Sequence, residues 1–321
     1  MSNAKNFALI GAAGYIAPRH MAAIQETNNH LVAALDKFDS VGIIDRFFPE
    51  ASFFTEPERF DRHLDKLRRL NQGQEVDYVS ICTPNYLHDS HIRLALRNNA
   101  HAICEKPIVL NPWNVDALQI IEQESQKNIY TILQLRLHPS VIALKKNIEK
   151  GPKDKIYDID LSYITARGKW YDISWKGDLS KSGGITTNIG IHLFDMLSFV
   201  FGKVKKSDVH LLQNNKAAGY LELEQARVRW FLSIDGNDIP KTRKEQGQNT
   251  YRSILMEGEE FEFSGGFSDL HTLSYQDILK GNGFRIEEAR QSIEMVHAIR
   301  NAKTIGLKGD FHPLLKTISY F

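Results

Sequence analysis

The stretch "ALIGAAGYIAPRHM", residues 8–21, decides which fold the sequence predicts. It places Gly11 and Gly14 between an apolar run typical of a buried strand and a run with helical character, where Pro18 suits a first helical turn. In such a turn, backbone amides and a helix N-terminus can face a pyrophosphate. The spacing is G-x-x-G-x-x-A rather than G-x-G-x-x-G, so a tight turn without a ligand is the alternative.

An acid follows the glycine turn at the end of the next apolar run, "HLVAALD". There the carboxylate of Asp36 can accept hydrogen bonds from a ribose diol and repel a 2'-phosphate, which favours NAD over NADP. Lys37 comes directly after it and partly offsets that repulsion. Tyr15 and Ile16, in the turn itself, are also expected at the cofactor.

Beyond the turn, short apolar runs alternate with helical patterns, which indicates a parallel sheet with crossover helices. Later runs are longer and alternate between apolar and polar residues, as in "ARVRWFLSI". We therefore predict an α/β Rossmann domain over residues 1–127. Residues 128–321 are predicted to form an α+β domain with an open, largely antiparallel sheet.

Composition limits the function classes. The chain has 321 residues, 42% hydrophobic and 25% charged, with a formal net charge of +1, which gives no electrostatic case for nucleic acid. No signal peptide or membrane segment is expected, and the cytoplasm is predicted. Cys82 and Cys104 lie in apolar runs and are expected to be buried and reduced. No metal is expected, because His88 and His91 lack an evident third ligand.

Two polar motifs follow predicted strands, where ligands bind in open parallel sheets. The motif "CTPNYLH" follows one strand and "CEKP" follows the next. An ammonium group beside a nicotinamide could hydrogen-bond a substrate hydroxyl and stabilise the developing alkoxide, so Lys106 is a catalytic candidate. A solvated Glu-Lys salt bridge is the alternative. The cofactor candidates from these motifs are Thr83, Pro84, Asn85, His88, Glu105, Lys106 and Pro107.

A polar stripe interrupts the apolar helix predicted in "KSGGITTNIGIHLFD". Asn188, His192 and Asp195 are spaced to share one helical face. His192 is the natural general base because histidine titrates nearest neutrality, and Asp195 could orient it or serve packing. A purely structural histidine is the alternative.

Together, the glycine turn, "TPNYLH", "EKP" and "GG....NIGIHLFD" resemble the Gfo/Idh/MocA oxidoreductase family over nearly the whole chain. The resemblance implies an N-terminal Rossmann domain, a C-terminal α/β domain and an active site between them. It also implies Lys106 and His192 as the catalytic pair. Much of the family has an acid where this chain has Asn188, which can still hydrogen-bond a substrate hydroxyl.

Several stretches, including "RGKWYDISWKGD" and "GFSDLHTLSYQDIL", resemble a narrower branch, the nucleotide-sugar dehydrogenases of the WlbA/WbpB type. That resemblance implies oxidation by NAD of the C3 hydroxyl of UDP-N-acetylglucosaminuronic acid, in the biosynthesis of bacterial surface polysaccharide (O-antigen). It further suggests 2-oxoglutarate as the oxidant of bound NADH. A homo-oligomer, either a dimer or a tetramer, is expected by analogy.

A nucleotide-sugar acid requires cations and aromatic surfaces around the reacting carbon. Two other functions stay open: a dehydrogenase of a free polyol or simple sugar, and a dinucleotide-binding sensor without chemistry. Protection from heat by UDP alone would favour the nucleotide sugar, and NADH absorbance appearing with substrate would exclude the sensor. The substrate-binding candidates are Lys106, Arg136, His138, Arg167, Trp175, Asn188, His192, Tyr251 and Arg252.

Overall fold

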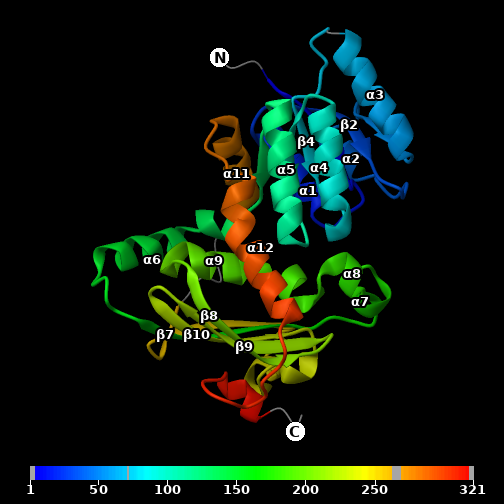
Figure 1. Cartoon of the computed structure of the whole chain (residues 1–321). Coiled ribbons are helices and arrows are strands. Elements are labelled where there is room, and N and C mark those ends of the chain that lie inside the picture. The colour runs from blue at the N-terminus through cyan, green and yellow to red at the C-terminus, as the bar shows by residue number, and fades with distance from the viewer. Residues whose placement is uncertain (1–3, 71, 262–268, 318–321) are drawn as a thin grey trace. The chain divides into compact units, whose positions relative to one another are not determined.

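The computed structural model describes residues 4–70, 72–261 and 269–317. Contacts among these residues divide the chain into two compact units. Unit 1 falls within Met1–Gln134 and Ser268–Arg290, and unit 2 within Leu135–Phe267 and Gln291–Phe321. Figure 1 shows the elements of each unit.

Unit 1 is built on a six-stranded sheet in the order β3-β2-β1-β4-β5-β6, and every neighbouring pair is parallel. The order reverses between β1 and β4, which is the switch point at which such sheets bind dinucleotides. The Rossmann prediction is confirmed. The strands are β1 (Asn6–Ile10), β2 (His30–Leu35), β3 (Ser52–Phe54), β4 (Tyr78–Ile81), β5 (His101–Cys104) and β6 (Ile129–Thr131).

Helices connect these strands because the segments between them carry one apolar face. In α3, for example, Phe60, Leu64 and Leu67 are buried while the charged residues face outward. The strands themselves are buried on both faces, as β4 shows with four buried residues of four. The connecting helices are α1 (Ala17–Glu26), α2 (Ile44–Phe47), α3 (Pro57–Leu70), α4 (His88–Arg97) and α5 (Pro112–Ser125).

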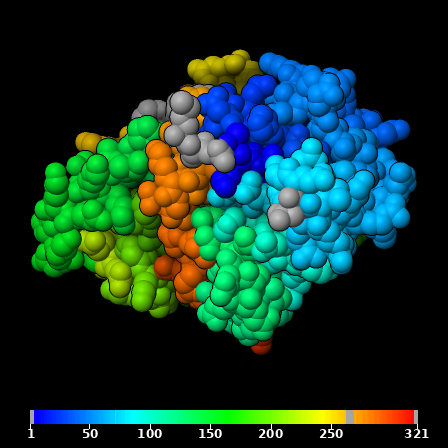
Figure 2. Space-filling view, turned by 90° about the horizontal axis from the view of Figure 1, so that it is seen from above, coloured from blue at the N-terminus to red at the C-terminus, as the bar shows by residue number. Residues whose placement is uncertain are grey.

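A segment from late in the chain completes unit 1. Helix α11 (Leu270–Leu279) packs against α1, and its Tyr275 and Ile278 enter the same core as Phe7 and Met21. The start of α12 (Ile286–Asn301) lies beside α5, where Arg290 Nη1 is 2.7 Å from Asp116 Oδ1. Figure 2 shows this orange segment next to the blue-green residues of α5. The division predicted at Lys127 leaves this segment in the second domain, because its apolar partners are distant in sequence.

Unit 2 contains a second six-stranded sheet, in the order β12-β11-β7-β10-β9-β8. Only the pair β7 and β10 is parallel, so the predicted largely antiparallel sheet is confirmed. Its strands are β7 (Tyr157–Thr165), β8 (Val204–Leu212), β9 (Lys216–Leu223), β10 (Ala226–Ser233), β11 (Thr250–Met256) and β12 (Glu259–Glu260). Besides α9 (Ile191–Phe201), the helices of unit 2 include α6 (Pro139–Lys150), α7 (Trp170–Ile173), α8 (Leu179–Ser182) and α10 (Lys241–Glu245).

The apolar helix predicted after the second glycine motif is α9 (Ile191–Phe201), preceded by a π-helical turn, η3 (Thr186–Gly190). It packs on β10: the rings of Phe194 and Trp230 lie 5.2 Å apart, edge to face. A Cβ at Gly190 would lie 2.6 Å from Leu232 Cδ1 and 2.8 Å from Phe194 Cε2, so a larger residue there would force these buried side chains to shift. The stretch Leu179–Phe201 is long and apolar enough to cross a membrane, but 78% of its most apolar window is buried, as in a core helix.

Candidate active site

The glycine turn joins β1 to α1. Gly11 has a φ of +92°, and a Cβ there would lie 2.8 Å from the carbonyl carbon of Cys82. A Cβ at Gly14 would lie 3.0 Å from the carbonyl oxygen of Gly11. Both positions therefore favour glycine, and the turn lies against the end of β4 at the switch point of the sheet.

Asp36 lies at this turn. One carboxylate oxygen accepts the backbone N–H of Ala13 at 2.9 Å, and the other accepts that of Phe38, also at 2.9 Å. The side chain is half-buried and fixed in the place from which a Rossmann acid reaches a ribose diol. Of the other residues predicted at the turn, Tyr15 is 91% exposed and Ile16 is half-buried.

The motif after β4 is braced by His88. Its Nδ1 lies 2.7 Å from the carbonyl oxygen of Pro107, and its Nε2 lies 2.8 Å from that of Thr83. Burial lowers the pKa of His88. His91, four-fifths of a turn further along α4, lies 3.0 Å from the hydroxyl of Thr83. The ring of His88 thus links the loops that follow β4 and β5, and the predicted cofactor residues Pro84 and Asn85 lie in the first of these loops.

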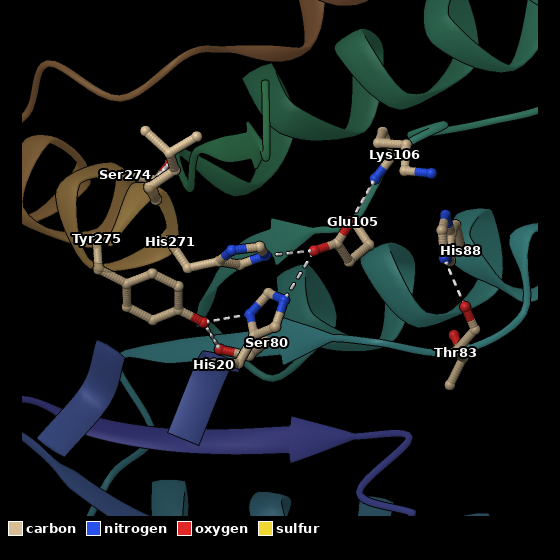
Figure 3. Close-up of polar contacts among 10 residues, drawn as sticks. His20, Ser80, Thr83, His88, Glu105, Lys106, His271, Ser274 and Tyr275 are labelled. Atoms are coloured by element: carbon tan, nitrogen blue, oxygen red, sulfur yellow. Dashed lines mark hydrogen bonds and ion pairs between the residues drawn. The ribbon is translucent and has the colours of Figure 1, made fainter. Parts of the chain in front are cut away.

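Glu105 follows β5 and is 7% exposed, so the alternative of a solvated Glu-Lys salt bridge is wrong. One carboxylate oxygen, Oε1, lies 3.0 Å from His20 Nε2 and 2.9 Å from His271 Nε2 (Figure 3). Burial alone would raise the pKa of Glu105, but the hydrogen bonds from His20 and His271 outweigh burial and hold that pKa well below its ordinary range. The buried carboxylate is therefore ionised.

Lys106 comes next in the chain and is half-buried. Its backbone N–H donates to Glu105 Oε2 at 3.2 Å. Figure 3 shows its side chain directed away from the two imidazoles. Position and burial suit the catalytic role predicted for this lysine, and that role stays a prediction.

In unit 2 the polar stripe begins in the π-helical turn. The side-chain amide of Asn188 donates to the hydroxyl of Tyr171 at 2.9 Å. Burial raises the pKa of Tyr171, and the hydrogen bond from Asn188 opposes that rise in part. His192 is half-buried in the first turn of α9. Single π turns inside helices are frequent at functional sites, which agrees with a site at this end of α9.

Asp195 and Arg136 form a buried ion pair. Arg136 Nε donates to Asp195 Oδ2 at 2.9 Å and Nη2 to Oδ1 at 2.8 Å, with side chains 10% and 4% exposed. Both oxygens of Asp195 thus bind the guanidinium that was predicted to bind an anionic group of the substrate. The same guanidinium lies 5.1 Å from the ring of Phe199. Arg136 therefore has a structural role in addition to the predicted one.

The loop after β7 gathers cations and aromatic rings. Arg167 is exposed and Trp175 is half-buried. Lys176, which the sequence did not single out, places its Nζ 5.1 Å from the ring of Trp170 and 5.6 Å from that of Trp175. Burial, and then the charge of Arg167, lower the pKa of Lys176. These groups could bind a phosphate and a flat base.

The remaining substrate candidates have structural partners. His138 is 3% exposed and caps α6, because its Nδ1 accepts the backbone N–H of Ser140 at 3.2 Å. Tyr251, on β11, packs against the core around Ile164 of β7. The guanidinium of its neighbour Arg252 lies 5.1 Å from the ring of Tyr163. A substrate role for these three stays a prediction.

The strand order, the glycine turn and the acid bound to that turn define a dinucleotide-binding Rossmann domain joined to an α/β domain. Two family models match the chain. The model described as "Oxidoreductase family, NAD-binding Rossmann fold" matches residues 5–132, and "Oxidoreductase family, C-terminal alpha/beta domain" matches residues 145–239. The chain belongs to the Gfo/Idh/MocA oxidoreductase family.

Solved structures narrow the comparison. The chain is 49% identical to the WlbA (WbpB) dehydrogenase of Thermus thermophilus, with a TM-score of 0.92 over 96% of this chain and 99% of that one. That enzyme was crystallised with NAD and alpha-ketoglutarate, and with NAD and UDP-GlcNAcA. The WlbA dehydrogenase of Bordetella pertussis is 20% identical over 97% of this chain and all of that one, with a TM-score of 0.76, and shows the fold alone.

Curated relatives match over shorter stretches. An inositol 2-dehydrogenase of Rhizobium meliloti is 28% identical over 42% of this chain and 39% of its own length. A D-glucoside 3-dehydrogenase of Escherichia coli is 25% identical over 64% of this chain and 57% of its own length. The chain thus spans about two fifths to three fifths of these relatives.

Proposed function

We propose that this protein is an NAD-dependent dehydrogenase that oxidises the C3 hydroxyl of UDP-GlcNAcA to a 3-keto sugar. The observation that carries the proposal is the 49% identity, over 99% of its length, to an enzyme crystallised with NAD and UDP-GlcNAcA. The WlbA/WbpB name of that enzyme implies a place in O-antigen biosynthesis. The cytoplasm is the proposed compartment, which agrees with two buried free cysteines.

The residues of unit 1 fit NAD. Gly11 and Gly14 bring backbone close to a pyrophosphate, and Asp36 offers a fixed carboxylate to the ribose diol. That carboxylate would repel the additional phosphate of NADP. NAD, when bound, supplies the acceptor for the hydride that leaves C3.

Two residues of the chain then act on the C3 hydroxyl of the substrate. Lys106 donates a hydrogen bond to the hydroxyl oxygen and stabilises the negative charge that develops there as the hydride leaves. His192 accepts the hydroxyl proton as general base. The C–H electron pair goes to the cofactor and the proton to the imidazole, so the products are a ketone, NADH and a protonated histidine.

Two further proposals concern partners. The Thermus neighbour was crystallised with alpha-ketoglutarate, and this acid is the proposed oxidant of the NADH that the reaction leaves. A homo-oligomer, dimer or tetramer, remains a prediction by analogy with the family.

The test measures NADH absorbance with purified protein, NAD and a panel of UDP-sugars and free polyols. We expect a signal with UDP-GlcNAcA and none with free polyols, and heat protection by UDP alone. Lys106→Ala should lower turnover by about 10²–10³-fold and leave NAD binding intact. Lys66→Ala, an exposed lysine of α3, is the matched control and should change neither.

Two results would contradict the proposed activity or substrate, and a third would contradict the role of Lys106. A signal with a free polyol but not with UDP-GlcNAcA would favour the function of the inositol 2-dehydrogenase relative. NAD binding with no NADH formed from any sugar would leave the protein as a dinucleotide-binding sensor. Unchanged turnover in Lys106→Ala would remove the assigned chemistry while leaving the substrate in place.

A further inference from the structure

Glu105, in the loop after β5, stands at the centre of a buried chain of polar groups from three elements of unit 1 (Figure 3). His20 comes from α1, Ser80 from β4, and His271 and Tyr275 from α11. Glu105 Oε1 binds both imidazoles, and its Oε2 accepts the backbone N–H of Lys106. The carboxylate therefore connects two histidines to the backbone of the predicted catalytic lysine.

The hydrogen bonds fix the form of His20. Its Nε2 lies 3.0 Å from an ionised oxygen and must carry the proton. Its Nδ1 lies 2.7 Å from the hydroxyl of Tyr275, which in turn lies 2.6 Å from the hydroxyl of Ser80. If Ser80 donates to Tyr275 and Tyr275 donates to Nδ1, every group is satisfied by a neutral imidazole. Burial lowers the pKa of His20, which agrees with the neutral form.

The protonation form of His271 follows from its two ring nitrogens. Its Nε2 lies 2.9 Å from the same oxygen of Glu105, so this nitrogen donates. Its Nδ1 is buried and has no hydrogen-bond partner within the part of the chain that the structure describes. An imidazolium would bury an N–H at Nδ1 without an acceptor, which costs more than a bare lone pair. His271 is therefore also a neutral Nε2–H donor.

We infer that His20 and His271 are positioning residues for Lys106: two neutral imidazoles that hold the Glu105 carboxylate ionised and oriented, so that its second oxygen fixes the backbone of the lysine. This inference rests on the proposed function. It also explains a function of residues 269–290, the late part of the chain that belongs to unit 1, because this segment supplies His271 and Tyr275. Among the described residues, the titratable groups that interact with Glu105 include His20, His271, Tyr275, Cys82, Cys104 and His88.

A metal ion is the competing explanation for the same cluster. Ligand atoms of His20, Glu105 and His271 all lie within 4.8 Å of one another, and two imidazoles with a carboxylate suit zinc. Binding through both Nε2 atoms would move each proton to Nδ1, where His271 has no acceptor among the described residues. The contacts of 2.9 and 3.0 Å are instead ordinary N–H···O distances.

The experiment compares His271→Leu with His271→Gln. Leucine removes the donor, whereas the glutamine amide keeps a donor near Nε2. We expect leucine to lower turnover by about tenfold or more with the KM for NAD unchanged, and glutamine to restore most of it. Losing a donor raises the pKa of Glu105, so the acid limb of the rate profile should move to higher pH in the leucine variant only.

Ser274→Ala is the matched control. Ser274 is a buried polar residue of the same helix, but its hydroxyl donates to the carbonyl of Leu270 at 2.8 Å and not to Glu105 (Figure 3). Its pH profile should stay that of the wild type. If His271→Leu does not fold, Tyr275→Phe tests the same chain, because it removes the donor to His20 Nδ1 and should shift the acid limb in the same direction.

Three results from the variants and from metal analysis would overturn the inference: a pH profile that does not move in His271→Leu, a glutamine variant as impaired as the leucine variant, or metal retained in stoichiometric amount after dialysis against chelator. Nitrogen NMR of the two histidines in the wild type needs no substrate and should show two neutral Nε2–H rings. An imidazolium in that spectrum would overturn the inference by itself. Absence of turnover with UDP-GlcNAcA in the wild type would instead refute the proposed function and leave the NMR result standing.

Discussion

The buried ion pair between Arg136 and Asp195 leads to a prediction about stability that is independent of any substrate. Both side chains are almost fully removed from water, and two hydrogen bonds of 2.8 and 2.9 Å join them. A pair of this kind contributes little relative to well-packed apolar residues, yet removing one partner is costly because a charge stays buried. We therefore expect the single substitutions to cost more than the double one.

The magnitude follows from burial. Replacing Arg136 by methionine takes the guanidinium away from a carboxylate that is 4% exposed, which should cost ~3–5 kcal/mol. At ~2–4 °C per kcal/mol for a unit of this size, the melting temperature of unit 2 should fall by roughly 6–20 °C. Asp195→Leu should cost a similar amount. The double variant Arg136→Met/Asp195→Leu should be more stable than either single variant.

The assay is thermal unfolding of the wild type, the two single variants and the double variant at one pH and protein concentration. Arg69→Met is the matched control, because Arg69 pairs with Asp65 on α3 with side chains 73% and 35% exposed. An exposed pair contributes only ~0.2–1 kcal/mol, so that melting temperature should change little. Additive losses in the double variant would refute the reasoning, since they would show that the two charges do not act as a pair.

Two further predictions concern unit 1 and unit 2. Asp36→Ala should weaken NAD binding by about tenfold and narrow the preference over NADP, because it removes a carboxylate fixed at the glycine turn; titration with both cofactors tests this, and an unchanged ratio contradicts it. Burial lowers the pKa of His312 to about 4 in the folded protein, below its ordinary value of 6.5. Between these two pKa values the unfolded chain binds the proton more readily, so the free energy of unfolding should decrease as the pH is lowered, by about 3 kcal/mol in all. His312→Asn should lose less melting temperature than the wild type between about pH 7 and about pH 4.5, and an equal loss would contradict the assignment.

Local rules predicted the parts of the site that are made by consecutive residues. Gly11 must be glycine because of its positive φ and its contact with Cys82, and a glycine turn after an apolar run indicates such a position. Asp36 was predicted from its place at the end of the next strand. Both predictions depend on the order of strands and turns, which the spacing of apolar residues and the length of each apolar run indicate.

Contacts between distant segments were not predictable in the same way. His20 and Tyr275 are joined although 255 positions separate them, and nothing in the local pattern of α1 or α11 indicates which residue faces which. The stretch containing His271 carried a signal only as a resemblance to one branch of the family. The polar stretch at residues 235–252 has the composition of a mobile loop, yet it contains the short helix α10 and the start of β11.

The pair of Arg136 and Asp195 shows why contacts that cannot be predicted from the local sequence affect the assignment of function. From sequence alone, a lone arginine near a predicted site indicates an anion, and an acid one turn from a histidine indicates an orienting group. The structure shows that each has the other as a partner, with both oxygens of Asp195 occupied by the guanidinium. A loss of activity in Arg136→Met would therefore follow from disturbance of α9 as readily as from a lost substrate contact. The double variant Arg136→Met/Asp195→Leu, which should be more stable than either single variant, separates these two causes. Turnover that stays low although the melting temperature recovers would assign the pair a part in the reaction.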